Sequence, residues 1–276
     1  MQHNKSLEYI KQQTSTIKQV FFIPGWLTKD TLQDDQIACL KRIYPQAEIQ
    51  PWFWDSYRTW SIARTNAENE GKRIAGVLES TVKSLESTAL VAHSLGGRVL
   101  THALAAMGKR ILVDHAVLLG AAIDYDHPYV DLLGAMDSAG NNIGGTLGPV
   151  LSCSNENDGV LKLVYGTREW KQALGLKGPK ARHIGLENRC VPANWTIGIQ
   201  GIRYQELVSE EILKGEMPTI DEIDQAVEAA LLTEGGVKKY QDGGFFDYST
   251  NPIGKYMGLD KHHSMLFLTF LSNVLS

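Results

Sequence analysis

One stretch constrains the fold of this 276-residue chain more than any other. An apolar run from Ala89 to Ala92 stops abruptly at the sequence His-Ser-Leu-Gly-Gly, in which the serine is Ser94. The apolar residues that follow take helical spacing on one face: Val99, Leu100, Ala103, Leu104 and Met107. The pattern therefore predicts a buried strand, a sharp turn with a serine at its tip, and a helix.

Small residues occupy the positions two before and two after the serine, namely Ala92 and Gly96. A serine held in a strained strand-to-helix turn needs such neighbours because the backbone there passes close to the adjoining strand. The N–H of Leu95, in the first turn of the helix, would face an oxyanion that forms beside the Ser94 hydroxyl. These features are typical of the nucleophile elbow of a serine hydrolase, although glycine is usual where this chain has Ala92.

A second apolar run, Val20 to Ile23, ends at Pro24-Gly25-Trp26-Leu27 and predicts a strand followed by a loop. In a hydrolase sheet this loop supplies the second oxyanion donor, and a glycine lets the backbone approach the substrate. We expect that donor to be the N–H of Trp26, with Leu27 as a neighbour that contacts the substrate.

Aromatic residues are concentrated between Pro51 and Trp60. They follow a predicted strand at 47–52, and two interpretations fit them equally. The rings fill core beside the sheet, or Trp52 and Trp54 line an apolar pocket for the acyl or leaving group.

A carboxylate is expected in the turn after a late strand, at the same sheet edge as the elbow. Asp158 follows the predicted strand 150–154 and is our choice for the triad acid. The alternative is that Asp158 only caps the helix predicted at 160–170. Asp124, after the preceding strand, is the rival acid, and Glu156 is less suited because it lies before the turn closes.

The predicted base is His263, directly before a final amphipathic helix that starts at Ser264. His262 is the alternative, and His93 is interpreted as packing. The other histidines (His3, His102, His115, His127 and His183) show no metal-ligand spacing. The three cysteines are scattered, which argues for reduced thiols. The sequence thus predicts neither a metal site nor a cofactor.

The chain is expected to be cytoplasmic and to carry one large domain. No apolar run approaches the length of a membrane span, and the first residues lack a secretory pattern. The net charge of −4 gives no electrostatic case for nucleic acid as a partner, and the oligomeric state stays open. We expect a polar lead-in at 1–18, an α/β core at 19–200 and 257–276 whose last strand lies within 188–200, and an inserted helical lid at 201–256.

The order Ser94, Asp158, His263 resembles the α/β-hydrolase superfamily, in which nucleophile, acid and base follow in that order. Two blocks, Ala-Val-Leu-Leu-Gly-Ala and Ser-Asn-Glu-Asn-Asp-Gly-Val-Leu-Lys-Leu-Val-Tyr, are similar to the branch that includes transmembrane and coiled-coil domain protein four. The resemblance implies an eight-stranded-type, mostly parallel sheet with helices on both faces. It also implies hydrolysis of an ester or related substrate. The membrane helices of that branch have no counterpart here, and the insertion before His263 is a further departure.

These observations predict a serine hydrolase that cleaves a small-molecule carboxylic ester or thioester with an apolar portion, as esterases and lipases do. Two alternatives remain open. One is amide hydrolysis or acyl transfer, and the other is a catalytically silent hydrolase fold used for binding.

Overall fold

A computed structural model describes residues 5–26, 34–56, 58–81, 87–110, 112–133, 135, 143–180, 185–192 and 264–275. The predicted lid at 201–256, His262, His263 and Leu27 lie outside these ranges.

At the centre of the described part of the chain lies a six-stranded sheet in the order β2-β1-β3-β4-β5-β6, and every neighbouring pair is parallel. The strands are β1 (Gln19–Ile23), β2 (Glu48–Pro51), β3 (Thr88–His93), β4 (His115–Leu119), β5 (Val150–Ser154) and β6 (Leu186–Cys190). From β1 the chain passes to β2 on one side, and it then crosses back over β1 to form β3 on the other side. Connections therefore diverge between β1 and β3, and the crevice beyond their carboxyl ends is where open α/β sheets bind ligands.

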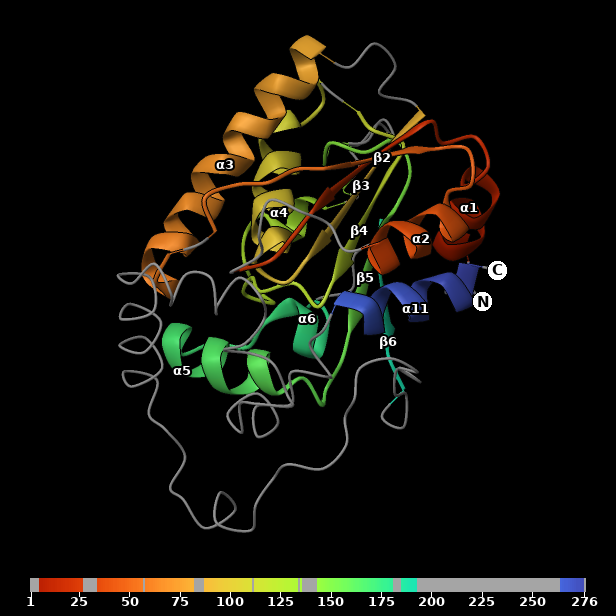
Figure 1. The fold of residues 1–276 in the computed structure, drawn as a ribbon. Coiled ribbons are helices and arrows are strands. Elements are labelled where there is room, and N and C mark those ends of the chain that lie inside the picture. Colours follow the sequence, from red (N-terminus) through yellow and green to blue (C-terminus); the bar gives the residue numbers. More distant parts are fainter. Residues whose placement is uncertain are drawn as a thin grey trace.

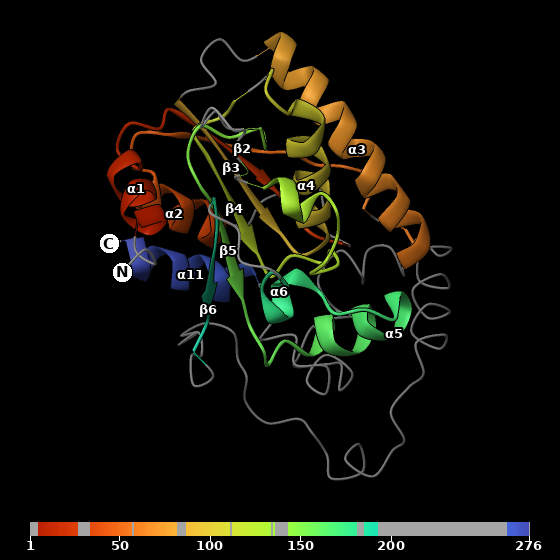
Figure 2. The same ribbon diagram turned by 180° about the vertical axis from the view of Figure 1, so that it is seen from behind.

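Helices cover both faces of the sheet (Figures 1 and 2). One face carries α3 (Trp60–Thr81) and α4 (Leu95–Met107), and the other carries α1 (Lys5–Gln13), α2 (Asp34–Ile43) and α11 (Ser264–Leu275). The short segments η3 (Val160–Tyr165), α5 (Gly166–Glu169) and α6 (Leu174–Lys177) follow β5. Another short helix, η2 (Val130–Leu132), follows β4. None of the described helices has the length and apolarity needed to cross a membrane.

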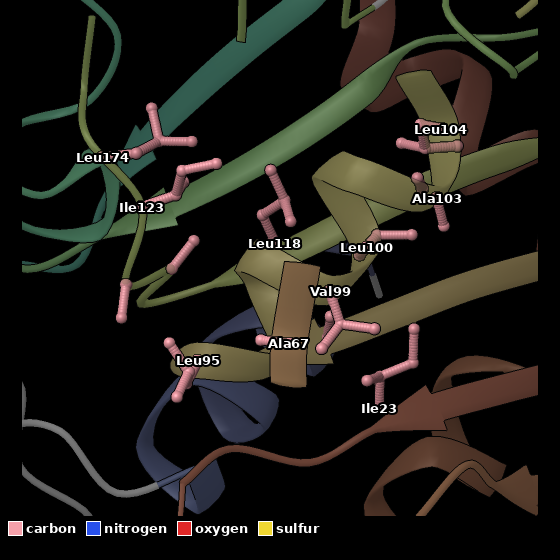
Figure 3. Close-up of a cluster of buried hydrophobic side chains, with 14 of the residues drawn as sticks. Ile23, Ala67, Leu95, Val99, Leu100, Ala103, Leu104, Leu118, Ile123 and Leu174 are labelled. Carbon is pink, nitrogen blue, oxygen red and sulfur yellow. The ribbon is translucent and has the colours of Figure 1, made fainter. Parts of the chain in front are cut away.

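Two apolar cores result from the alternation of side chains along the strands. In β1, Phe21 and Ile23 face the helices α3 and α4, whereas Val20 and Phe22 face the opposite layer. Figure 3 shows the first core, where Val99 and Leu100 of α4 pack near Ile23 and Leu118. Because the central strands are buried on both faces, their sequences are continuous apolar runs, as is usual for parallel strands between two helical layers.

Parts of the fold differ from what the sequence predicted. Residues 1–18 contain α1, and its Ile10 is fully buried in the second core, so this segment packs on the domain. The last described strand, β6, begins at Leu186, two residues before the predicted interval, and residues 195–199 lie outside the described ranges. The helix predicted at 160–170 begins as the π-helix η3 and continues as α5. The described sheet has six strands, and the eight-stranded type that the resemblance implied stays an expectation for the whole chain.

Candidate active site

Ser94 occupies the tip of the turn between β3 and α4 with φ 54° and ψ −124°. A residue with a side chain avoids positive φ, and holding one there costs about 1–3 kcal/mol. The surrounding backbone fixes the turn: the Ser94 N–H donates to the Leu119 carbonyl at 3.0 Å, and the Ser94 carbonyl accepts from the N–H groups of Gly97 and Ala122, each at 2.9 Å. The strain that the sequence predicted for this serine is present.

Two glycines let the loop after β1 lie against this turn. A Cβ on Gly96 would stand 2.4 Å from the Ile23 carbonyl oxygen, so no larger residue fits two positions after the serine. A Cβ on Gly25 would stand 2.7 Å from the Cβ of Ser94. The Pro24-Gly25-Trp26 loop therefore reaches the serine closely enough for its backbone to contact a substrate bound there.

The two predicted oxyanion donors lie at this junction. Leu95 is the first residue of α4, and the N–H groups of a first helical turn have no partner within the helix. Trp26 is anchored by its indole, which donates to the Arg58 carbonyl at 2.7 Å. The Trp54 indole donates to the Pro24 carbonyl at 2.9 Å and so holds the same loop at a second point. Both donor assignments stay predictions.

Gly25→Ala is expected to lower kcat for ester hydrolysis by about tenfold or more, because the new methyl group displaces the donor loop from Ser94. Gly76→Ala on α3 is the matched control, since its Cβ would meet nothing within 4 Å. The control should keep kcat and gain up to about 1 kcal/mol of stability from helix propensity. Equal kcat values for the two variants would refute the close approach of this loop to the reacting centre.

Asp158 is fully buried in the turn after β5. Its Oδ1 accepts a hydrogen bond from the Leu161 N–H at 2.9 Å, so it does cap the helix that follows. Capping does not compete with orienting a base, because a carboxylate accepts hydrogen bonds at two oxygens. Asp158 therefore lies in the predicted turn after β5, and it also caps the following helix, which was the alternative explanation for this residue.

Asp124, the rival acid, has partners at both carboxylate oxygens. The Tyr165 hydroxyl donates to Oδ1, and the Lys171 ammonium lies 3.0 Å from Oδ2. Burial favours the neutral acid, but these hydrogen bonds and the nearby Arg98 guanidinium outweigh it and lower the pKa of Asp124. Asp124 is therefore a partnered anion within an ionic network, and the choice of Asp158 as the acid stays a prediction.

The start of α11 lies at the same edge of the sheet as Ser94. Its first residue, Ser264, accepts a hydrogen bond from the Gln36 side chain at 2.7 Å. Phe267, one turn later, packs its ring 6.1 Å from the ring of His93, the neighbour of Ser94. The start of α11 therefore lies close to the elbow, and His263 and His262 lie outside the described residues.

Of the predicted pocket residues, Trp54 supports the loop after β1, and Trp52 contacts the outer part of the sheet. The Trp52 indole donates to Glu70 at 2.6 Å, and its ring packs edge-on to Phe21. Neither side chain is placed against Ser94 by these contacts. Trp60, which the sequence analysis did not single out, packs edge-on to Trp26 with 5.3 Å between ring centroids.

Within the described residues, no group of three or more His, Cys, Asp and Glu side chains could hold a metal ion. His102 instead packs between the rings of His127 and Tyr129, at 5.4 Å and 4.9 Å. Burial lowers the pKa of His102 to about 4, so its imidazole stays neutral at physiological pH. His115 is hydrogen-bonded to Asp114 and Tyr44.

Comparisons with known proteins gave similar solved structures at low sequence identity. No protein-family model matches the sequence. No curated protein matches it either. Esterase B from Lactobacillus rhamnosis is similar over 83% of this chain and 79% of its own, with 12% identity and a TM-score of 0.40. The Francisella virulence factor BioJ is similar over 77% of both chains, with 13% identity and a TM-score of 0.38. A puromycin-hydrolyzing peptidase from Mycobacterium tuberculosis is similar over 63% of this chain and 30% of its own, with 14% identity and a TM-score of 0.35.

The identification of the fold depends on the strand order and the elbow. The six described strands are all parallel, helices cover both faces of the sheet, and a serine at positive φ follows β3, the strand at which the connections diverge. This is the α/β-hydrolase fold. It accounts for the convergence of the loops after β1, β3, β4 and β5 at one edge of the sheet.

Proposed function

We propose that the protein is a serine hydrolase that cleaves a carboxylic ester or thioester through an acyl-Ser94 intermediate. The observation that carries this proposal is the backbone of Ser94, held at φ 54° with the loop of Gly25 against it. A strained conformation of this kind persists only where the surrounding structure enforces it, and it is concentrated at active sites. An idle serine would gain nothing from a position that glycine occupies without strain.

The proposed reaction uses a triad of Ser94, Asp158 and His263. The Ser94 hydroxyl attacks the carbonyl carbon while His263 takes its proton, and the oxyanion is held by the N–H groups of Leu95 and Trp26. The ester bond breaks as His263 passes the proton to the leaving alcohol or thiol. Water then attacks the acyl-enzyme by the reverse proton transfers and releases the acid. Asp158 fixes the imidazole tautomer and supports its positive charge.

The substrate is proposed to have an apolar portion, because the rings of Trp26 and Trp60 stand beside the donor loop. Acyl transfer or amide hydrolysis would use the same residues, and a silent hydrolase fold would leave Ser94 unreactive. A cytoplasmic location and the likeness to the branch with transmembrane and coiled-coil domain protein four stay proposals from the sequence.

Reaction of the purified protein with a fluorophosphonate probe tests this function. Because the probe phosphonylates only a serine activated by its base, we expect one covalent adduct at Ser94, located by peptide mass spectrometry. Hydrolysis of a short p-nitrophenyl ester should be lost in parallel with labelling. A protein that neither labels nor turns over this ester would be the silent binding fold.

The two adjacent histidines give a separate prediction. His263→Ala should abolish both ester turnover and fluorophosphonate labelling near neutral pH, because it removes the group that is proposed to take the Ser94 proton. His262→Ala is the matched control and should mainly change KM. If His262→Ala is the inactive variant and His263→Ala labels normally, His262 is the base and the hydrolase function is retained.

A further inference from the structure

The loops at the carboxyl edge of the sheet are joined through one tyrosine, Tyr165. It ends the π-helix η3, which starts two residues after Asp158, and it is fully buried. Its hydroxyl donates to the Asp124 carboxylate and accepts from the Arg98 guanidinium at 3.2 Å. Burial raises the pKa of Tyr165, so the hydroxyl remains protonated and keeps its role as a donor. A single hydroxyl thereby connects the segment after β5 with the turn after β4 and with α4.

Arg98 links Tyr165 to the turn that holds Ser94. It lies one turn after Ser94 in α4, with 2% of its surface exposed. A buried guanidinium has to be paired, and Glu68 at 3.0 Å and Asp124 at 3.9 Å supply the opposite charge. Its Nε also donates to the Ala122 carbonyl at 3.4 Å. The N–H of the same Ala122 holds the Ser94 carbonyl, so Arg98 reaches the elbow through one residue.

The ring of Tyr165 makes a second connection, to the loop after β1. It packs edge-on against Trp60 with 6.0 Å between centroids, and Trp60 packs in the same way on Trp26. Trp60 is fixed in turn by its indole, which donates to Glu169 at 2.8 Å. The residue before Trp26 is Gly25, which lies against Ser94. Tyr165 is therefore linked to the loop after β1 through one ring, Trp60, and to the elbow through Arg98 and Ala122.

We propose that Tyr165 is a positioning residue, whose hydroxyl, held by Arg98 and Asp124, sets the place of the Asp158 turn relative to Ser94. This inference rests on the proposed function, because it assigns a role within the same site. A triad needs its nucleophile and acid held within a fraction of an ångström, and a 1 Å displacement costs about a hundredfold in rate. Loss of the hydroxyl leaves the Tyr165 ring in place but breaks the hydrogen bond that joins the segment after β5 to the turn after β4.

The experiment compares two buried tyrosines that each lose only a hydroxyl. Tyr165→Phe should lower kcat for p-nitrophenyl ester hydrolysis by about tenfold, keep KM within about twofold, and slow fluorophosphonate labelling in proportion to kcat. Tyr44→Phe is the control, since its hydroxyl is hydrogen-bonded at 2.9 Å to His115, the first residue of β4, at the opposite end of the sheet. It should lower Tm and leave kcat unchanged when both variants are assayed well below their melting temperatures.

A double mutant shows whether the effect passes through Asp124. If it does, Tyr165→Phe combined with Asp124→Asn should lose no more activity than the more damaging single variant. The inference is overturned if Tyr165→Phe keeps kcat within about twofold of the unmodified protein, or if Tyr44→Phe loses as much kcat as Tyr165→Phe. The proposed function fails separately, when the unmodified protein itself neither labels nor turns over the ester.

Discussion

Ser94→Ala should lower the turnover of a short p-nitrophenyl ester by about four to six orders of magnitude, because it removes the hydroxyl that is proposed to form the acyl intermediate. The fold should be unaffected. Alanine at φ 54° bears the same backbone strain as serine, and the 6% exposed side chain loses a single oxygen. The measurement is kcat/KM with Tm recorded on the same preparation. A variant that keeps most of its activity would refute Ser94 as the nucleophile.

Ser94→Gly separates strain from chemistry. It should be as inactive as Ser94→Ala and yet more stable, because glycine adopts positive φ without a steric penalty. A gain in the free energy of unfolding of about 1 kcal/mol is expected, offset in part by the larger backbone entropy of glycine in the unfolded chain. Greater stability in an inactive variant is the result expected if the strain at this turn is maintained for function.

The elbow could be predicted from the sequence because it depends on local spacing. The apolar run to Ala92, the small Gly96 and the helical pattern from Val99 all lie within a dozen or so residues of Ser94. The buried strands were likewise visible, since parallel strands between two helical layers are apolar throughout. The start of β6 was predicted two residues too late, because only Leu186 of its residues is buried, as expected for a strand at the edge of the described sheet. α1 was missed because its burial depends mainly on Ile10 in an otherwise polar helix.

The ionic network around Tyr165 could not be predicted, because its members are distant in sequence. Arg98 and Tyr165 are separated by 67 positions, and Tyr165 and Asp124 by 41. Each residue taken alone has an ordinary explanation: an arginine on a helix surface, an aspartate after a strand, a tyrosine in a core. Only the three-dimensional arrangement shows that Asp124 is paired, and this changes the comparison between the two possible acids.

Asp158→Asn should lower kcat by about three to four orders of magnitude, because an amide does not stabilise the imidazolium and favours the wrong tautomer of the base. Asn keeps the shape of the side chain and its oxygen accepts from the Leu161 N–H, so the cap is largely retained. The loss should therefore appear in kcat rather than in Tm.

Asp124→Asn is the matched variant, one strand earlier at the same edge. It removes a charge that faces Lys171, Arg98 and Tyr165, so it should weaken the network and cost no more than about tenfold in kcat.

Because the pKa of Asp124 is lowered in the folded protein, the stability it contributes is present above the ordinary pKa of an aspartate and is lost as the pH falls through the lowered value. Asp124→Asn should accordingly lower Tm at neutral pH, with a smaller difference from the unmodified protein in strong acid. If Asp124→Asn were the inactive variant and Asp158→Asn retained turnover, the acid would belong to the turn after β4, and the partners of Asp124 would be supports for a catalytic group.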